Sequence, residues 1–215
     1  MSIALAVIFD MDGVIVNSEP LHERAFYALM DQLGYGHNHG IRVADFIGRS
    51  DTELWLEFIA KHRPAQPIKE LLALKRKLVI GLLRDEEIFA GLPELIENVA
   101  RRYRIALASG SERPFIDAVL ALKDLRHFFP VIADAGEVAK GKPAPDIFLL
   151  AARRLGVEPE ECWVIEDSKP GITAGLAAGM RVIAVTNTHP AAELHHATHV
   201  ARNYEEIAQL LASEQ

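Results

Sequence analysis

The sequence predicts an α/β protein with a parallel β-sheet, helices on both faces of the sheet and a helical segment inserted after the first strand. From about residue 92 onward, short apolar runs alternate with stretches of helical periodicity, which is the pattern of a parallel sheet. Residues 17–90 hold helical patterns and no good strand, and a structureless loop of that length would be unusual. We therefore expect a core of residues 1–16 and 91–215 and a helical insertion of residues 17–90.

Five apolar runs are too short for helices, and most are rich in valine and isoleucine, as buried strands are. They are Ala4–Phe9, Ile105–Ala108, Val131–Ala133, Trp163–Ile165 and Val182–Val185.

The helices are predicted from apolar spacing and from residues that begin or end helices. Pro114 suits a first helical turn, and Gly156 and Gly179 suit the positions just after a last turn. The helices predicted in the core are Leu92–Arg102, Pro114–Leu122, Asp146–Leu155 and Gly171–Ala178. The helices predicted in the insertion are Leu21–Leu33, Asp51–Lys61 and Ile68–Leu83.

Composition and charge exclude several classes of protein. The net charge of −7 gives no basic footprint for nucleic acid, and no stretch resembles a membrane span or a signal peptide. The single cysteine, Cys162, excludes an intramolecular disulfide and favours a reducing compartment, so we expect a cytoplasmic protein. The basic run Leu74–Lys77 is interpreted as a solvated helix face. No feature indicates the oligomeric state, and a monomer is slightly favoured.

Chemically useful side chains follow the predicted strands, at the edge of the sheet where α/β proteins bind ligands. They are Asp10, Asp12 and Gly13 after the first strand, Ser109, Gly110 and Ser111 after the second, Asp134 and Lys142 after the third, and Glu166 and Asp167 after the fourth.

The acidic residues among them predict a divalent cation. Asp10, Glu166 and Asp167 offer the hard oxygen ligands that Mg²⁺ requires. Close carboxylates without a cation would repel one another and raise one another's pKa. We therefore expect Mg²⁺ as the cofactor.

The remaining residues predict a bound phosphate. Ser109 and Lys142 can bind its non-bridging oxygens, and Gly13 and Gly110 allow backbone N–H groups to approach the anion.

The two aspartates at the end of the first strand then have distinct expected roles. Asp10 can attack phosphorus and form an aspartyl-phosphate. Asp12 can protonate the leaving oxygen as general acid and later activate water as general base.

Each of these motifs is weak when taken alone. "DMDG" and "ASGS" are common as turn chemistry, and "EDS" before a helix can be an N-cap. The four motifs together, each at the end of a predicted strand and chemically complementary, favour a functional site.

The segments "VIFDMDGV", "LASGS", "GKPAP" and "VIEDSKPG" resemble, in this order, the motifs of the haloacid dehalogenase superfamily of phosphotransferases. The resemblance covers nearly the whole chain and implies a Rossmann-like, doubly wound core with a helical cap inserted after strand one. It makes Asp10 the nucleophile, Asp12 the acid/base, and Ser109 and Lys142 the phosphate ligands. The Mg²⁺ shell that it implies consists of Asp10, the backbone carbonyl of Asp12, Glu166 and Asp167.

The segment "DGVIVNSEPLH" is typical of the subgroup that contains beta-phosphoglucomutase and sugar-phosphate phosphatases. The substrate-binding positions expected from these patterns are Gly13, Gly110, Ser111, Ser18, His22 and Arg49. Lys75 and Lys77 are weaker candidates of the same kind.

We expect a Mg²⁺-dependent phosphatase whose partner is a small phosphorylated metabolite, such as a sugar phosphate. The alternative is a phosphomutase of the beta-phosphoglucomutase type, although Ser18 stands where the mutase carries threonine and the arginine of "GRSD" is placed differently. A non-catalytic protein on this fold would be expected to lose catalytic groups, and "LASGS" is not a serine-hydrolase nucleophile elbow.

The histidines near the C-terminus do not match a recognised zinc signature, so a surface turn and helix are expected there. They are His189, His195, His196 and His199.

Overall fold

The computed structural model describes residues 5–46 and 51–213, and its internal contacts divide the chain into two compact units. One unit consists of the chain up to Asn17 together with the chain from Glu87 onward, and the other is Ser18–Glu86. The sequence prediction divides the chain after residue 16 and after residue 90. Arg49 and Ala4 lie outside the described residues.

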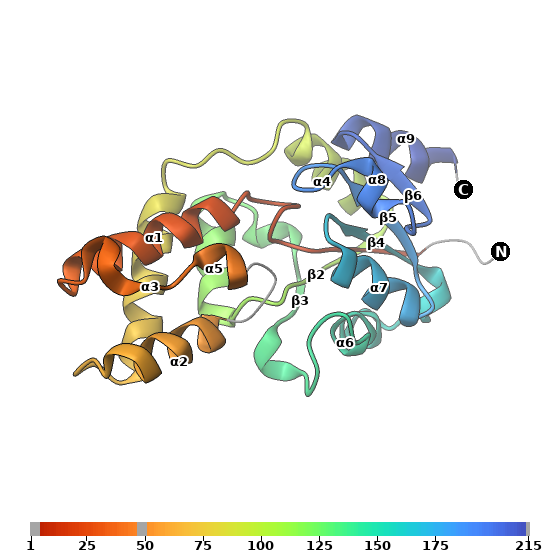
Figure 1. The fold of residues 1–215 in the computed structure, drawn as a ribbon. Helices are drawn as coiled ribbons and strands as arrows, with labels where there is room; N and C mark the ends of the chain where they lie inside the picture. The colour runs from red at the N-terminus through yellow and green to blue at the C-terminus, as the bar shows by residue number, and fades with distance from the viewer. Residues whose placement is uncertain (1–4, 47–50, 214–215) are drawn as a thin grey trace. The chain divides into compact units, whose positions relative to one another are not determined.

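The first unit is built on a six-stranded sheet in which all pairs of neighbouring strands are parallel, so the predicted α/β class is confirmed (Figure 1). The strands are β1 (Ala6–Phe9), β2 (Arg104–Ala108), β3 (Val131–Ala133), β4 (Cys162–Glu166), β5 (Arg181–Val185) and β6 (His199–Ala201). The side chains of β1 and β4 are fully buried on both faces, which explains why these strands are apolar throughout except for Glu166 at the end of β4.

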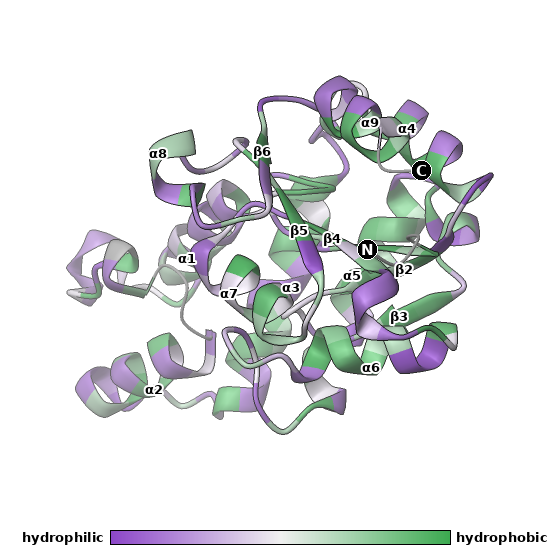
Figure 2. Ribbon diagram, turned by 90° about the vertical axis from the view of Figure 1, so that its right-hand side faces the viewer, coloured by the Kyte–Doolittle hydropathy of each residue, from purple (hydrophilic) through white to green (hydrophobic). Residues whose placement is uncertain are grey.

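Helices cover both faces of this sheet. The α-helices of the unit are α4 (Leu92–Ala100), α5 (Arg113–Leu122), α6 (Asp146–Leu155), α7 (Lys169–Ala177), α8 (Ala191–Leu194) and α9 (Tyr204–Ser213). Short 3₁₀ turns occur at η3 (Arg126–Phe128), η4 (Ala135–Glu137) and η5 (Pro159–Glu161). Figure 1 shows α6 and α7 on one side of the sheet and α4 and α9 on the other, and Figure 2 shows the strands β2 and β3 mostly in the hydrophobic colour.

In the strand order β3-β2-β1-β4-β5-β6, successive strands are added on one side of β1 up to β3 and on its other side from β4 onward, so the order reverses between β1 and β4. Chain connections leave these two neighbours in opposite directions, which opens a crevice beyond their carboxyl ends where doubly wound proteins bind ligands. Asp10 follows β1 directly, and Glu166 is the last residue of β4. The topology therefore brings the first and fourth predicted motifs to one place.

The second unit is helical. It contains α1 (Glu19–Gln32), the 3₁₀ turns η1 (Gly36–His39) and η2 (Val43–Phe46), α2 (Asp51–His62) and α3 (Ile68–Leu83). Its core combines aliphatic and aromatic side chains, and the ring of Trp55 packs against those of Phe26 and Phe58. The unit thus has a hydrophobic cluster of its own.

Three features differ from the sequence-based expectations. The predicted turn and helix near the C-terminus are present as α8 and its flanking turns, but His199 then begins the unpredicted strand β6. Helix α9 was also not predicted. The interpretation of Leu74–Lys77 as a solvated face is wrong for Lys75, which is buried because α3 turns it toward the interior of its unit, whereas Lys77 is exposed.

Within the described residues, no helix combines the length and the apolar character needed to cross a bilayer.

Candidate active site

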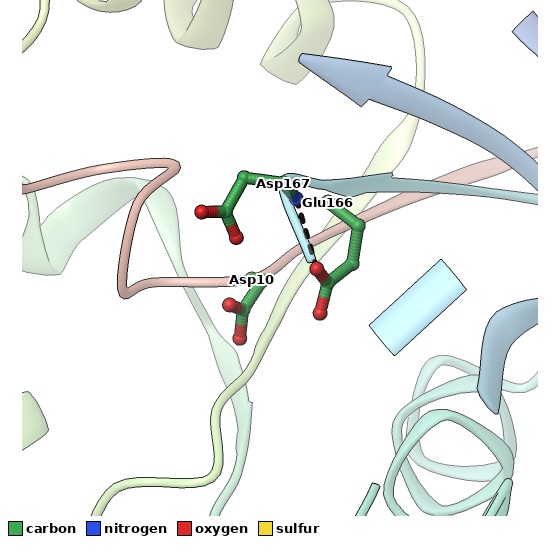
Figure 3. Close-up of side chains that lie close together, drawn as sticks. All are labelled: Asp10, Glu166 and Asp167. Carbon is green, nitrogen blue, oxygen red and sulfur yellow. Dashed lines mark hydrogen bonds between the residues drawn. The ribbon is translucent and has the colours of Figure 1, made fainter. Parts of the chain in front are cut away.

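Three buried carboxyl groups gather where β1 and β4 end (Figure 3). Asp10 follows β1, Glu166 ends β4, and Asp167 follows it, each with 5% or less of its surface exposed. One oxygen from each residue lies within 4.8 Å of the others. Hard oxygen donors at this spacing are suited to a divalent cation.

Lys142 completes the cluster with one positive charge. Its Nζ donates to Asp10 Oδ1 and to Glu166 Oε1, both at 2.6 Å. Burial acts to lower the pKa of Lys142, but the carboxylates of Asp10 and Glu166 outweigh it and raise this pKa above its usual value. Lys142 is therefore a charged, doubly anchored ammonium beside the carboxylate of Asp10.

The electrostatics of the cluster fit a divalent cation. Three carboxylates face one ammonium in a buried space, so the cluster has an excess of negative charge. Burial, followed by repulsion from Glu166, raises the pKa of Asp167 to about 7. Burial also raises the pKa of Asp10 well above its usual value, against the opposing attraction of Lys142. A bound Mg²⁺ would offset the excess charge, and the donors are of the type it prefers.

Glu166 is held on both oxygens. Its Oε2 accepts from the backbone N–H of Asp167 at 2.8 Å, and from the N–H and the hydroxyl of Ser168, both at 2.9 Å. Its Oε1 accepts from Lys142. Gly171 leaves the room that this carboxylate needs, because a Cβ at position 171 would lie 1.6 Å from Oε1. These contacts fix Glu166 before any ligand binds.

Asp12 accepts hydrogen bonds from two serines that follow β2. Its Oδ2 accepts from the hydroxyl of Ser111 at 2.9 Å and from that of Ser109 at 3.2 Å, and Ser109 Oγ accepts from the backbone N–H of Ser111 at 3.0 Å. The segment after β2 therefore positions the carboxyl group expected to act as acid and base. The expected phosphate ligand Ser109 thus contacts Asp12 directly.

Gly13 forms the tight turn after Asp12. Its φ is +76°, and a Cβ there would lie 1.9 Å from Asp167 Oδ2, so only glycine fits. Gly110 is exposed, and a Cβ there would meet no atom within 4 Å, so no protein atom requires glycine at this position. The expected contact between its backbone N–H and an anion remains a prediction. Asp134, which was noted at the end of β3, caps η4 by accepting from the N–H of Gly136.

Sequence reasoning missed three residues at the site. Thr188 donates to Asp167 Oδ2, Asn187 donates to the carbonyl of Gly13, and Tyr204 donates to the carbonyl of Val14. They lie after β5 and at the start of α9, in segments that carry no recognised motif.

The expected substrate-binding residues of the helical unit have contacts within that unit. Ser18 is buried just before α1. His22 Nδ1 lies 3.9 Å from Asp51 Oδ2, and the buried Lys75 donates to Asp51 Oδ1. Arg49, the remaining candidate, lies outside the described residues.

Known proteins with similar sequences include phosphatases of phosphorylated sugars and sugar alcohols. The fructose-1-phosphate phosphatase of Escherichia coli K12 is 36% identical over 180 residues, which cover 83% of this chain and 95% of that protein. Hexitol phosphatase B of the same strain is 35% identical over 188 residues, which cover 84% of this chain and 83% of that protein.

A solved structure with the same fold is a beta-phosphoglucomutase from Clostridium difficile. It superposes with a TM-score of 0.76 at 27% identity, over 98% of each chain. Residues 5–179 also match the family model described as haloacid dehalogenase-like hydrolase. Together with the clustered motifs at the carboxyl ends of β1 and β4, these similarities show that the chain belongs to the haloacid dehalogenase-like hydrolase family.

Proposed function

We propose that this protein is a Mg²⁺-dependent phosphatase that hydrolyses a small phosphorylated sugar through a phosphorylated Asp10. The observation that carries the proposal is the buried cluster of Asp10, Glu166 and Asp167, with Lys142 Nζ bonded to two of the three carboxylates. The sequence similarity to a fructose-1-phosphate phosphatase and to a hexitol phosphatase also supports phosphatase activity.

The residues that would hold Mg²⁺ are Asp10, Glu166, Asp167 and the backbone carbonyl of Asp12. Glu166 Oε1 is bonded to Lys142 and its Oε2 has three donors, so its carboxylate is oriented by the protein itself. When bound, Mg²⁺ supplies positive charge that offsets the negative charge of the phosphoryl group and of the attacking carboxylate.

In the first half of the reaction, a carboxylate oxygen of Asp10 attacks phosphorus and the bond from phosphorus to the sugar oxygen breaks. Asp12 gives its proton to that leaving oxygen, so the sugar departs as a neutral alcohol. The ammonium of Lys142, held 2.6 Å from Asp10 Oδ1, stabilises the negative charge on the transferring phosphoryl group.

In the second half, Asp12 is a carboxylate and takes a proton from water as the water oxygen attacks phosphorus. The bond between phosphorus and Asp10 breaks, which releases inorganic phosphate and restores both aspartates. The hydroxyls of Ser109 and Ser111 hold Asp12 Oδ2 and so orient the carboxyl group that serves as acid and then as base.

We assign substrate selection to the helical unit, Ser18–Glu86. Its candidates are His22, Asp51 and Lys75, of which Asp51 lies between the other two in a chain of polar contacts, together with Arg49. Burial lowers the pKa of Lys75, against the attraction of Asp51, so this lysine gives up its proton more readily than a solvated lysine does.

The proposal is tested by incubating the purified protein with phosphorylated sugars, including fructose 1-phosphate and hexitol phosphates, and measuring released phosphate. We expect release with Mg²⁺, loss with EDTA and recovery when excess Mg²⁺ is added. Phosphate release that continues unchanged in EDTA contradicts the Mg²⁺ assignment. If none of the substrates releases phosphate, the proposed phosphatase activity is contradicted.

The similarity to a beta-phosphoglucomutase supports a second candidate function. A mutase would use the same Asp10 and Asp12 but transfer the phosphoryl group between two oxygens of the sugar. Incubation with glucose 1-phosphate and a sugar bisphosphate primer separates the two activities, since a mutase yields an isomer and a phosphatase yields free phosphate.

A further inference from the structure

Three side chains that no motif identifies reach the carboxyl ends of β1 and β4 from the C-terminal part of the chain. Asn187 and Thr188 follow β5, and Tyr204 is the first residue of α9. All three belong to the same compact unit as Asp10. We call Asn187, Thr188 and Tyr204 the clamp.

Thr188 acts on the carboxyl group of Asp167. Its Oγ1 donates to Asp167 Oδ2. The same oxygen faces the α-carbon of Gly13, where even a methyl group would overlap it. The Asp167 carboxylate is therefore held between a hydroxyl on one segment and the turn after β1 on another, which leaves it little freedom to rotate.

Asn187 and Tyr204 act on that turn. Asn187 Nδ2 donates to the Gly13 carbonyl and to the Tyr204 hydroxyl, both at 2.8 Å, and Tyr204 in turn donates to the Val14 carbonyl. Two consecutive carbonyls of the turn are therefore tied to one linked pair of side chains. Tyr204 has only 2% of its surface exposed, so water does not replace these bonds easily.

This restraint extends to the carbonyl of Asp12. The backbone N–H of Gly13 donates to the carbonyl of Val16 at 2.8 Å. In a planar trans peptide, the carbonyl points opposite to the N–H, so fixing the N–H of Gly13 fixes the direction of the Asp12 carbonyl. The clamp holds the carbonyl of the next peptide, between Gly13 and Val14, and so limits movement of the turn that carries the Asp12 carbonyl.

We propose that the clamp is a set of positioning residues for the Mg²⁺ site: Thr188 orients Asp167, and Asn187 with Tyr204 orients the backbone that carries the Asp12 carbonyl. This inference rests on the proposed function, because both restrained groups are assigned there to the Mg²⁺ shell. Groups that orient metal ligands typically change metal affinity 10- to 100-fold when they are removed.

The first test compares Thr188→Val with Thr188→Ser. Valine keeps the shape but lacks the hydroxyl, whereas serine keeps the donor. We expect Thr188→Val to raise the Mg²⁺ concentration for half-saturation about 10-fold, and Thr188→Ser to restore it nearly to the wild-type value. Thr173→Val is the matched control, since Thr173 Oγ1 donates to the carbonyl of Lys169 on an exposed part of α7.

The second test compares Tyr204→Phe with Tyr103→Phe. Both tyrosines are buried and donate to a backbone carbonyl, but Tyr103 donates to Leu211 near the end of α9, whereas Tyr204 donates to Val14 in the turn after β1. Both variants should lose thermal stability to a similar degree in EDTA. We expect only Tyr204→Phe to weaken Mg²⁺ binding.

Binding is read in two ways: the rise in melting temperature with increasing MgCl₂ in the absence of substrate, and the Mg²⁺ dependence of phosphate release. The inference is overturned if Thr188→Val and Tyr204→Phe bind Mg²⁺ as the wild type does, whatever their stability. It is also overturned if Thr188→Ser fails to restore binding. A wild-type protein that neither binds Mg²⁺ nor releases phosphate contradicts the proposed function itself, and the clamp with it.

Discussion

Replacing Gly171 by alanine tests how tightly the active site is packed. A Cβ at this position would lie 1.6 Å from Glu166 Oε1, whereas ordinary contact begins at 3.4 Å. The carboxylate or the first turn of α7 must therefore move by about 1.8 Å, the difference between these two distances. A hydrogen bond does not survive a displacement of that size, so the 2.6 Å bond from Lys142 to Glu166 should break.

The expected cost follows from the nature of that bond. Removing one partner of a buried ion pair destabilises a protein by about 3–5 kcal/mol because it leaves an uncompensated buried charge, and moving Glu166 away from Lys142 leaves such a charge. We expect Gly171→Ala to lower the free energy of unfolding by about this amount in EDTA, as measured by urea denaturation. Misplacement of Glu166 should also raise the Mg²⁺ half-saturation of phosphate release by at least 10-fold.

Gly175→Ala provides the matched control on the same helix. A Cβ at position 175 would lie 2.7 Å from Val182 Cγ2, and its next nearest atoms belong to Val164, so this variant also crowds the core of the unit but does so against valine side chains. It should lose stability while keeping the wild-type Mg²⁺ half-saturation. The reasoning is refuted if Gly171→Ala matches the wild type in both measurements, or if the two variants weaken Mg²⁺ dependence equally.

Three further predictions concern the carboxyl groups. Asp10→Asn should abolish hydrolysis of an aryl phosphate, because an amide cannot attack phosphorus, and sustained turnover would refute its role as nucleophile. Asp12→Asn should lower kcat for the hydrolysis of alkyl phosphates by about 10²–10⁴-fold and for aryl phosphates much less, because only the poor leaving group needs the proton. An equal loss of kcat on both substrates would count against the role of Asp12 as general acid. The pKa of Asp167 is about 7 in the fold against an ordinary value of 3.8, so the metal-free folded protein holds a proton that the unfolded chain releases. The free energy of unfolding in EDTA should therefore fall as the pH rises from 4 to 7, by at most about 1.4 kcal/mol per pH unit for this group. Asp167→Asn removes the titrating group, so it should flatten the dependence of the melting temperature on pH. A variant with the same pH dependence as the wild type would contradict the raised pKa of Asp167.

Much of the catalytic unit could be predicted because its strands are buried on both faces. Such strands appear as short apolar runs, and parallel strands place their carboxyl ends at one edge of the sheet. Asp10 and Glu166 therefore stand out at the points where apolar runs stop. Strand β3 is equally short but is wholly apolar, whereas β6 begins with His199, so no comparable apolar run marks it.

The clamp could not be predicted for a different reason. Asn187 and Thr188 lie in a segment whose composition is that of an ordinary turn, and a tyrosine at the start of a helix has no fixed meaning. Asn187 and Thr188 contact Gly13 and Asp167 because β5 lies beside β4 in the sheet. The order of the strands is not visible in the sequence around residues 187 and 188. The burial of Lys75 was missed similarly, since lysine in a helix is usually solvated.

The division of the chain into one continuous and one discontinuous unit has a consequence for biosynthesis. Ser18–Glu86 is a single stretch with its own hydrophobic cluster, so the contacts within it become available as soon as that stretch has left the ribosome. Strand β1 is synthesised before it, yet β1 pairs with β2 and β4, which end near residues 108 and 166. The N-terminal strand must therefore wait for more than half of the polypeptide to be made, and the nascent chain acquires its helical module well before it acquires the means to catalyse a reaction.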